Sequence, residues 1–144
     1  MFSKACEYAI KAAIFIAERS LNKHKVSQQE VADAIAGPKA FTAKTLQKLT
    51  KQNLISSIKG PNGGFYATPS QLNNVSLIDI VKAIDGLESL TGCGLGLTEC
   101  NDDKPCPVHH EYKPIREKML QMLSATNIKQ LAKDTKKGNT FLSR

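Results

Sequence analysis

Three cysteines and one histidine in the second half of the chain are the residues best suited to chemistry. Cys93, Cys100 and Cys106 follow the spacing C-x6-C-x5-C, and His109 comes three residues after the last cysteine. Thiolates bind soft, thiophilic centres, which in proteins are mainly zinc ions and iron–sulfur clusters. The sequence therefore predicts a zinc or cluster site in this segment.

The composition of residues 87–107 favours a cluster over zinc. Glycines at 92, 94 and 96 let the loop wrap around a centre and present peptide N–H groups to its sulfurs. The spacing is not the C-x2-C pattern of a zinc ribbon, and widely spaced cysteines suit a centre larger than one ion. We expect a 2Fe–2S or 4Fe–4S cluster, with zinc as the alternative.

Most cluster sites need a fourth ligand, and two residues are candidates for it. His109 lies one turn into the helix that is expected to follow the loop. Glu7 lies in the first helix and could reach the loop of a partner subunit if the dimer crosses over. The residues alone leave both ligands open.

Two helices that precede this segment have the pattern of a helix-turn-helix. Ser27 and Glu30 form a capping box that opens the first helix, and Gly37-Pro38 ends it. The second helix, from about residue 41 to 52, turns leucines inward and lysines outward. The outer face of this second helix is the predicted recognition surface.

A β-hairpin is expected directly after the second helix. Residues 54–58 are apolar and alternating, residues 59–64 are rich in turn formers, and residues 65–67 can return as a strand. Helix-turn-helix and hairpin together predict a winged helix.

The charge of this region points to nucleic acid. No Asp or Glu lies between residues 34 and 78, whereas the segment contains five lysines of a chain with net charge +7. A patch of one sign on a helix and a wing is typical of proteins that bind the phosphate backbone. We expect contacts to double-stranded DNA from Lys39, Thr42, Lys44, Thr45, Lys48, Lys51, Ser57, Lys59, Gly60, Asn62 and Gly63.

The remaining elements complete a mainly α fold with a small β-hairpin. We expect a first helix over residues 3–21, a connecting loop over 69–74, a helix capped by Ser76 and Asp79, and a short last helix capped by Thr126. Between these lies a long helix ending near residue 124, whose apolar seam predicts a homodimer contact, with packing on the helix that begins at Ser76 as the alternative. The seam residues are Tyr112, Ile115, Met119, Met122 and Leu123.

The expected organisation has four parts. Residues 1–86 form a winged helix-turn-helix DNA-binding domain, 87–107 a cysteine-rich loop, 108–132 dimerisation helices and 133–144 a basic flexible tail. No apolar run could span a bilayer and no signal peptide is evident, so a cytoplasmic protein without a membrane partner is expected. Neither a phosphate-binding glycine fingerprint nor a nucleophile–base pair is present, which argues against an enzyme.

Three features together resemble a known family. Residues 54–65, residues 75–86 and the three cysteines before a long helix are similar to the winged-helix bacterial regulators of the IscR and NsrR type, the iron–sulfur branch of the Rrf2 family. This resemblance implies a homodimeric transcription regulator, in the first instance a repressor, that binds a palindromic operator. Its cluster, held by the loop cysteines, would sense redox state, nitric oxide or iron–sulfur status.

The resemblance also has departures. The first cysteine gap is six residues where five is commoner, Ala43 replaces a base-reading glutamate, and Lys59 replaces an arginine of the wing. For the fourth ligand, the run ending at His109 matches the histidine type, whereas the run beginning at Glu7 matches members that use a carboxylate from the other subunit. The alternative function is a zinc-stabilised or metal-free winged-helix regulator with a different effector.

Overall fold

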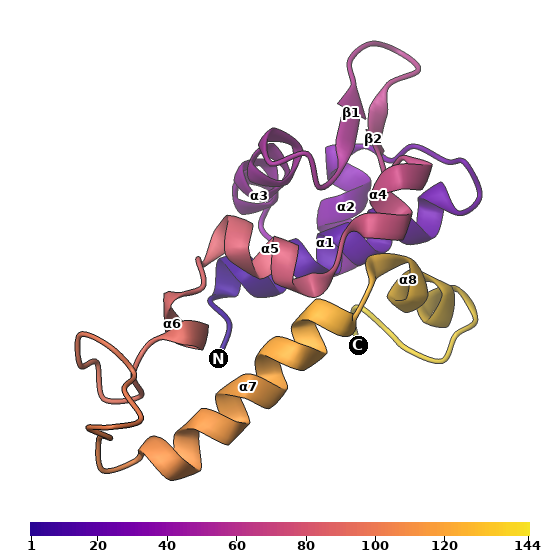
Figure 1. Ribbon diagram of the computed structural model, residues 1–144. Coiled ribbons are helices and arrows are strands. Elements are labelled where there is room, and N and C mark those ends of the chain that lie inside the picture. Colours follow the sequence, from indigo (N-terminus) through magenta and orange to yellow (C-terminus); the bar gives the residue numbers. More distant parts are fainter.

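The computed structural model describes residues 1–144 as a mainly helical chain with one two-stranded antiparallel sheet (Figure 1). This architecture confirms the expected fold class. The elements are α1 (Lys4–Ser20), α2 (Gln28–Ile35), α3 (Lys39–Lys51), β1 (Ser56–Ile58), β2 (Gly64–Tyr66), α4 (Pro69–Asn74), α5 (Leu77–Ile84), α6 (Glu88–Thr91), α7 (His109–Ala125) and α8 (Ile128–Lys136).

Helix α1 is the centre of the fold. Helices α2, α3, α5 and α8 all pack against it. Small side chains on α1 allow this close approach, because a helix lined by alanine lets neighbouring backbones come near. The fully or almost fully buried residues of α1 are Cys6, Ala9, Ala12, Ala13, Ile16 and Ala17.

The helix-turn-helix begins with the capping box that the sequence predicts. The Glu30 N–H donates to Ser27 Oγ at 3.1 Å, and the Ser27 N–H donates to Glu30 Oε1 at 3.3 Å. Helix α2 ends at Ile35, and Ala36 adopts a left-handed conformation with φ of 51°. Pro38 is the N-cap of α3, so this helix starts at Lys39, two residues before the predicted start.

The wing is a hairpin in which Ser56 pairs with Tyr66 and Ile58 with Gly64. Two glycines are required by close approaches of the backbone. A Cβ at Gly63 would lie 2.1 Å from the Ile58 carbonyl oxygen, and one at Gly64 would lie 2.8 Å from the Val26 carbonyl oxygen. The turn chemistry of residues 59–64 therefore fixes both the hairpin and its attachment to the segment before α2.

Three sequence predictions about secondary structure were wrong. Residues 69–74 form helix α4 and not a loop, because Thr68 and Gln71 make a capping box and Pro69 occupies the first turn. Residues 88–91 form the short helix α6 within the segment expected to be irregular. The last helix is capped by Asn127, not Thr126, and it ends at Lys136, so the first four residues of the segment expected to be a tail are helical.

Helix α7 extends away from the rest of the molecule (Figure 1). Its C-terminal end packs on α5, where Leu123 is completely buried, whereas its N-terminal end supports the cysteine loop. The loop and the wing therefore lie at opposite ends of the molecule (Figure 1). None of the helices is both long enough and apolar enough to cross a membrane.

Candidate functional site

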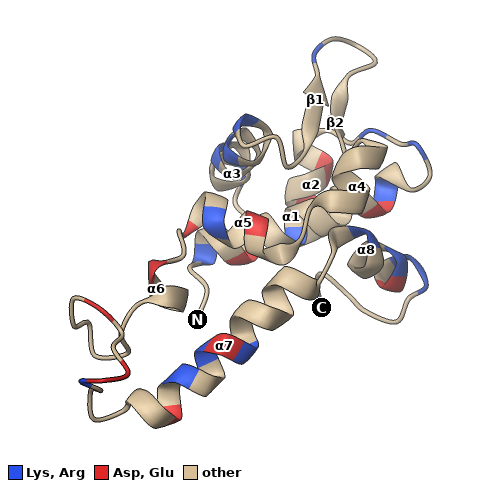
Figure 2. Cartoon of the chain, in the orientation of Figure 1, with Lys and Arg blue, Asp and Glu red and all other residues tan.

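The outer face of α3 has the character that its pattern predicts. Leu46 and Leu49 are completely buried against the core, and Lys44, Gln47, Lys48 and Lys51 are exposed on the other side, together with Lys39 at the first turn. Figure 2 shows these basic residues grouped on α3 without a neighbouring acidic residue on the same helix. The exposed face is therefore a cationic ridge.

Two predicted base-contacting residues are not on this ridge. Thr42 and Thr45 are 1% and 3% exposed, and their hydroxyls donate to the carbonyl oxygens of Pro38 and Phe41. The prediction that they face DNA was wrong. Since α3 starts at Lys39, positions 42, 45, 46 and 49 share its buried side, and the threonines satisfy their own hydroxyls one turn back.

The wing presents its tip to solvent. Ser57, Lys59, Gly60 and Asn62 are exposed, whereas Gly63 is half-buried in the turn. Lys59 directly follows β1, at the start of the turn. Wing and ridge thus form two separate cationic prominences on one domain.

In the cysteine loop, Cys93 and Cys106 contact each other. Both are half-buried free thiols. The Leu95 N–H donates to Cys93 Sγ at 3.4 Å. Backbone N–H groups of Leu95 and Leu97, together with a hydrogen bond from Cys106, lower the pKa of Cys93 below its usual value. Peptide donors aimed at a sulfur are what a thiolate ligand requires.

The third loop cysteine, Cys100, belongs to a chain of polar contacts at the start of α7. Its Sγ lies 3.5 Å from His109 Nδ1, and His109 Nε2 lies 2.8 Å from Asp102 Oδ1. Lys113 Nζ donates to both Asp102 oxygens, at 2.7 and 2.9 Å, and this contact lowers the pKa of Asp102. His109 itself is only 4% exposed, so its contacts with Cys100 and Asp102 hold the imidazole in one orientation.

A buried arginine that the sequence analysis missed lies beneath the same loop. Arg116 is 8% exposed; its guanidinium donates to the Gly92 carbonyl oxygen and, at 3.4 Å, to Cys100 Sγ. Its Nε has no partner. The signal for it was the spacing of His109, Lys113 and Arg116, which places all three on one face of a helix.

The donor chemistry of the loop fits an iron–sulfur cluster. Three thiols, an oriented imidazole and a buried cation lie against one end of α7. No three of the His, Cys, Asp and Glu side chains are close enough together to hold a single metal ion. The candidate ligands instead form two pairs, Cys93 with Cys106 and Cys100 with His109.

Glu7, the other candidate ligand, is placed elsewhere. It lies on the first turn of α1, where its Oε2 is 2.8 Å from Lys4 Nζ. This ion pair lowers the pKa of Glu7, and no hydrogen bond connects it to the cysteine loop of its own chain. A ligand role for Glu7 would therefore require a partner subunit.

The predicted dimer seam divides into two parts. Leu123 is completely buried in the core of its own chain and Met119 is half-buried, so the alternative of packing on α5 holds for Leu123. Tyr112 contacts the cysteine loop, and its hydroxyl donates to the Ser89 carbonyl oxygen at 3.5 Å. Ile115 and Met122, two turns apart on α7, remain 62% and 47% exposed.

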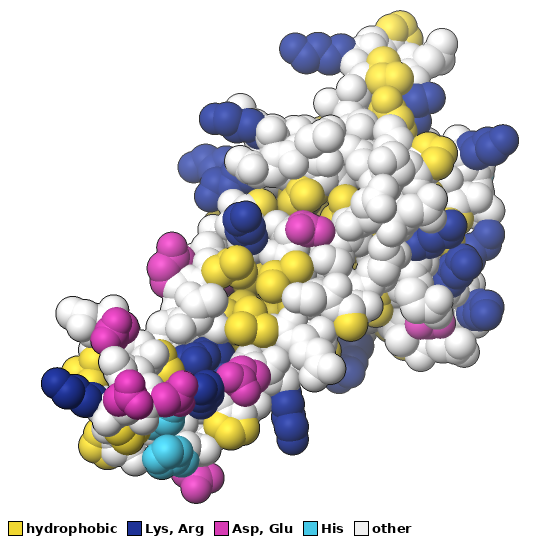
Figure 3. Space-filling model, in the orientation of Figure 1, with side chains coloured by type: hydrophobic (Ala, Val, Ile, Leu, Met, Phe, Trp, Pro, Cys, Tyr) yellow, Lys and Arg dark blue, Asp and Glu magenta, His cyan; other side chains and the backbone are white.

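The loop and the winged helix carry opposite charge. Acidic residues gather around the loop, at positions 88, 99, 102 and 103, against one lysine at 104. Figure 3 shows acidic side chains and histidines at the loop end and lysines around the opposite end of the molecule. Like charges repel, so the loop end is unsuited to contact DNA.

Comparisons with known proteins agree with this architecture. The chain is similar to CymR (YrzC), the global cysteine regulator of B. subtilis, with TM-score 0.74 and 19% identity over 92% of this chain and 96% of that one. It is also similar to T. potens IscR, with TM-score 0.73 and 14% identity over 97% and 91% of the two chains. The oxidised form of Staphylococcus aureus CymR gives TM-score 0.70 and 20% identity over 92% and 95%. At these identities the likeness establishes the fold.

The family assignment comes from the sequence model of the Rrf2 family, described as iron-dependent transcriptional regulators, which matches residues 2–134. No curated protein sequence matches the chain. The match confirms the expected transcription regulator and the expectation that the chain is not an enzyme. The chain belongs to the Rrf2 family.

Proposed function

We propose that the chain is a homodimeric DNA-binding repressor whose operator affinity is controlled by an iron–sulfur cluster in the cysteine loop. One observation supports this proposal: a buried histidine in contact with Cys100 and two further thiols belong to one segment, at the end of the molecule opposite the cationic winged helix. A sensor and a reader are thus built into separate ends of one chain.

The reader is the ridge of α3 together with the wing. Lys44, Gln47 and Lys48 are placed to enter a major groove, because they project from the middle of an exposed helix. Lys39, Lys51 and Lys59 would contact phosphates on either side, and phosphate contacts fix the register without specifying sequence. With Thr42 and Thr45 buried, base recognition falls on fewer residues than the sequence suggested.

Cys93, Cys100, Cys106 and His109 are the proposed ligands. His109 is favoured over Glu7 because its Nδ1 already faces Cys100 while Asp102 occupies Nε2. Ligating histidines commonly bond a carboxylate through their second nitrogen, which fixes the tautomer and the ring. When bound, the cluster would supply iron that reacts with oxidants or nitric oxide. Arg116 would balance the negative charge of the thiolates in a poorly solvated position.

The dimer contact is proposed at the exposed stripe of α7. Ile115 and Met122 lie on one side of the helix, away from the chain's own core, and apolar side chains so placed are suited to pairing with a second copy. Because α7 carries the loop at one end and meets the core at the other, pairing along it links the loop to the distance between the two winged helices.

The coupling would act through the start of α7. Arg116 and the Cys100–His109–Asp102–Lys113 chain are the contacts that join the loop to this helix. Loss of the cluster would change these contacts and with them the position of α7 in the dimer, which would alter operator affinity.

The test is visible absorption together with iron and acid-labile sulfide analysis on protein purified without oxygen. We expect brown protein, bleached by Cys100→Ala. Cys6→Ala is the matched control, because Cys6 is buried in the winged-helix domain and should leave the colour unchanged. Colourless protein that binds zinc, or no metal even after reconstitution, would overturn the cluster proposal and leave the regulator with another effector.

A second pair of variants decides the fourth ligand. His109→Ala should lower cluster occupancy and Glu7→Gln should not. The reverse result would assign the ligand to Glu7 of the partner subunit.

A further inference from the structure

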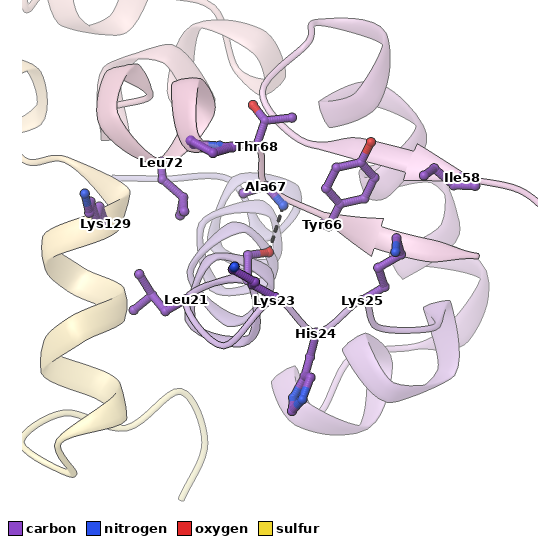
Figure 4. A pocket seen from close by; sticks show the side chains of 12 residues that line it. Leu21, Lys23, His24, Lys25, Ile58, Tyr66, Ala67, Thr68, Leu72 and Lys129 are labelled. Carbon is purple, nitrogen blue, oxygen red and sulfur yellow. Dashed lines mark hydrogen bonds between the residues drawn. The ribbon is translucent and has the colours of Figure 1, made fainter. Parts of the chain in front are cut away.

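A pocket of about 610 Å³ lies between the wing and the C-terminal helix (Figure 4). These elements are at the end of the molecule opposite the cysteine loop (Figure 1). Its walls come from the end of α1, from both strands of the wing, from the start of α4 and from α8. This volume is within the range of small-molecule sites in proteins. The pocket is therefore large enough for an organic ligand and too small for a folded partner.

Apolar side chains line the pocket, and two of its polar groups, the Ser20 hydroxyl and the Ala67 N–H, are hydrogen-bonded to each other. Leu21, Ile58, Tyr66 and Leu72 provide apolar surface from four different elements (Figure 4). Ser20 Oγ accepts from the Ala67 N–H at 2.8 Å and donates to the Ile16 carbonyl oxygen at 2.7 Å. The apolar side chains make the interior suitable for a hydrocarbon or aromatic body.

The rim is cationic. Lys23, Lys25 and Lys129 line the pocket together with His24, and no Asp or Glu is among the lining residues. Two of the lysines are held in place: Lys129 Nζ donates to Asn73 Oδ1 at 2.9 Å, and Lys25 Nζ lies 5.8 Å from the centre of the Tyr66 ring. Positive charge over an apolar floor favours an anionic head group on an apolar body.

We propose that this pocket binds a small organic anion, a carboxylate, sulfonate or phosphate attached to an apolar or aromatic body. The proposal uses none of the cluster residues, so it stands or falls independently of the cluster. A ligand there contacts Ile58 and Tyr66 of the wing and Lys129 of the helix that follows α7. Such an anion would change the affinity for DNA only if it favoured one position of the wing over another.

Anilinonaphthalenesulfonate is a suitable probe, since it joins an aromatic body to a sulfonate and fluoresces in apolar surroundings. The folded full chain should bind it saturably, one per chain, and Lys129→Glu should weaken the binding about fivefold through reversal of one rim charge. Lys133→Glu is the matched control, because Lys133 is exposed on the same helix and does not line the pocket; it should leave the affinity unchanged. Equal effects of the two variants, or no saturation, would overturn the proposal.

Two further arms separate charge from hydrophobicity and from DNA contact. Phenylnaphthylamine has the same aromatic body without the sulfonate and should bind clearly more weakly; equal binding would show that the lysines are irrelevant. The second arm measures binding of a duplex to the ligand-free protein. If Lys129→Glu weakened duplex binding and left the affinity for anilinonaphthalenesulfonate unchanged, the rim would be a phosphate contact for DNA. The small-anion site would then be rejected.

Discussion

Different forces stabilise the winged helix and the cysteine loop. The winged helix has a continuous apolar core around α1, with side chains such as Ile16, Leu46 and Leu49 completely buried. The cysteine loop, residues 87–107, exposes Leu95 and Leu97. It is held mainly by Arg116 and by the polar contacts of His109 with Cys100 and Asp102. Apolar burial is cooperative and non-directional, whereas a few polar contacts can be exchanged for metal ligation without unfolding the rest.

The same division holds for charge. The charged residues of α3 and the wing are all lysines, whereas those of the loop are mostly acidic. Under the proposed function, this division would let the acidic loop rearrange while the basic winged helix keeps its shape. The following predictions test this division, beginning with the largest effect.

The largest effect is expected in the core. Leu49→Ala should lower the free energy of unfolding by about 3 kcal/mol, because it removes a completely buried side chain and leaves a cavity. Urea denaturation followed by circular dichroism measures the change. Leu97→Ala in the loop is the control and should change it by less than about 0.5 kcal/mol, since Leu97 is 55% exposed. Comparable losses would mean that loop and core unfold as one unit.

A smaller effect is expected beneath the loop. Arg116→Ala should lower the free energy of unfolding by about 1–2 kcal/mol, because it leaves the Gly92 carbonyl without its donor and removes a contact to Cys100. Amide hydrogen exchange should become faster in residues 92–100 and stay unchanged in α1. Lys118→Ala, at an exposed site of the same helix, should be neutral. Unchanged loop exchange in Arg116→Ala would remove the arginine from the support of the loop.

The effect on DNA binding should be electrostatic and modest. Lys59→Ala should weaken binding to all duplex sequences and reduce the slope of log affinity against log salt by about one, as expected for one lost phosphate contact. Lys82→Ala, an exposed lysine of α5, serves as the control. A slope identical to that of the unchanged chain would place Lys59 outside the interface.

The smallest effect is expected at Cys6. Burial raises the pKa of its thiol to about 12, so it is neutral at pH 8 and should resist iodoacetamide at that pH in the folded, cluster-free chain. The three loop cysteines should be alkylated under the same conditions, which mass spectrometry can count. Alkylation of Cys6 at the rate of the loop cysteines would show that the winged helix opens as readily as the loop.

Local signals in the sequence were sufficient for most of the winged helix. The Ser27–Glu30 capping box and the glycine-rich turn at 59–64 are decided by neighbours in the chain, and both were predicted. The burial of Thr42 and Thr45 was missed because it depends on where Pro38 starts α3. Arg116 was missed because its role depends on a loop carbonyl 24 residues away. The division of the α7 seam likewise depends on long-range packing, which no periodicity reveals.

The most direct test of the proposed switch is the affinity of the loaded and the cluster-free protein for a duplex enriched from random sequences by either form. The proposal predicts affinities that differ about fivefold or more, with Cys100→Ala matching the cluster-free form. Equal affinities of all three proteins for the same duplex would contradict it and would leave the loop without a role in DNA binding.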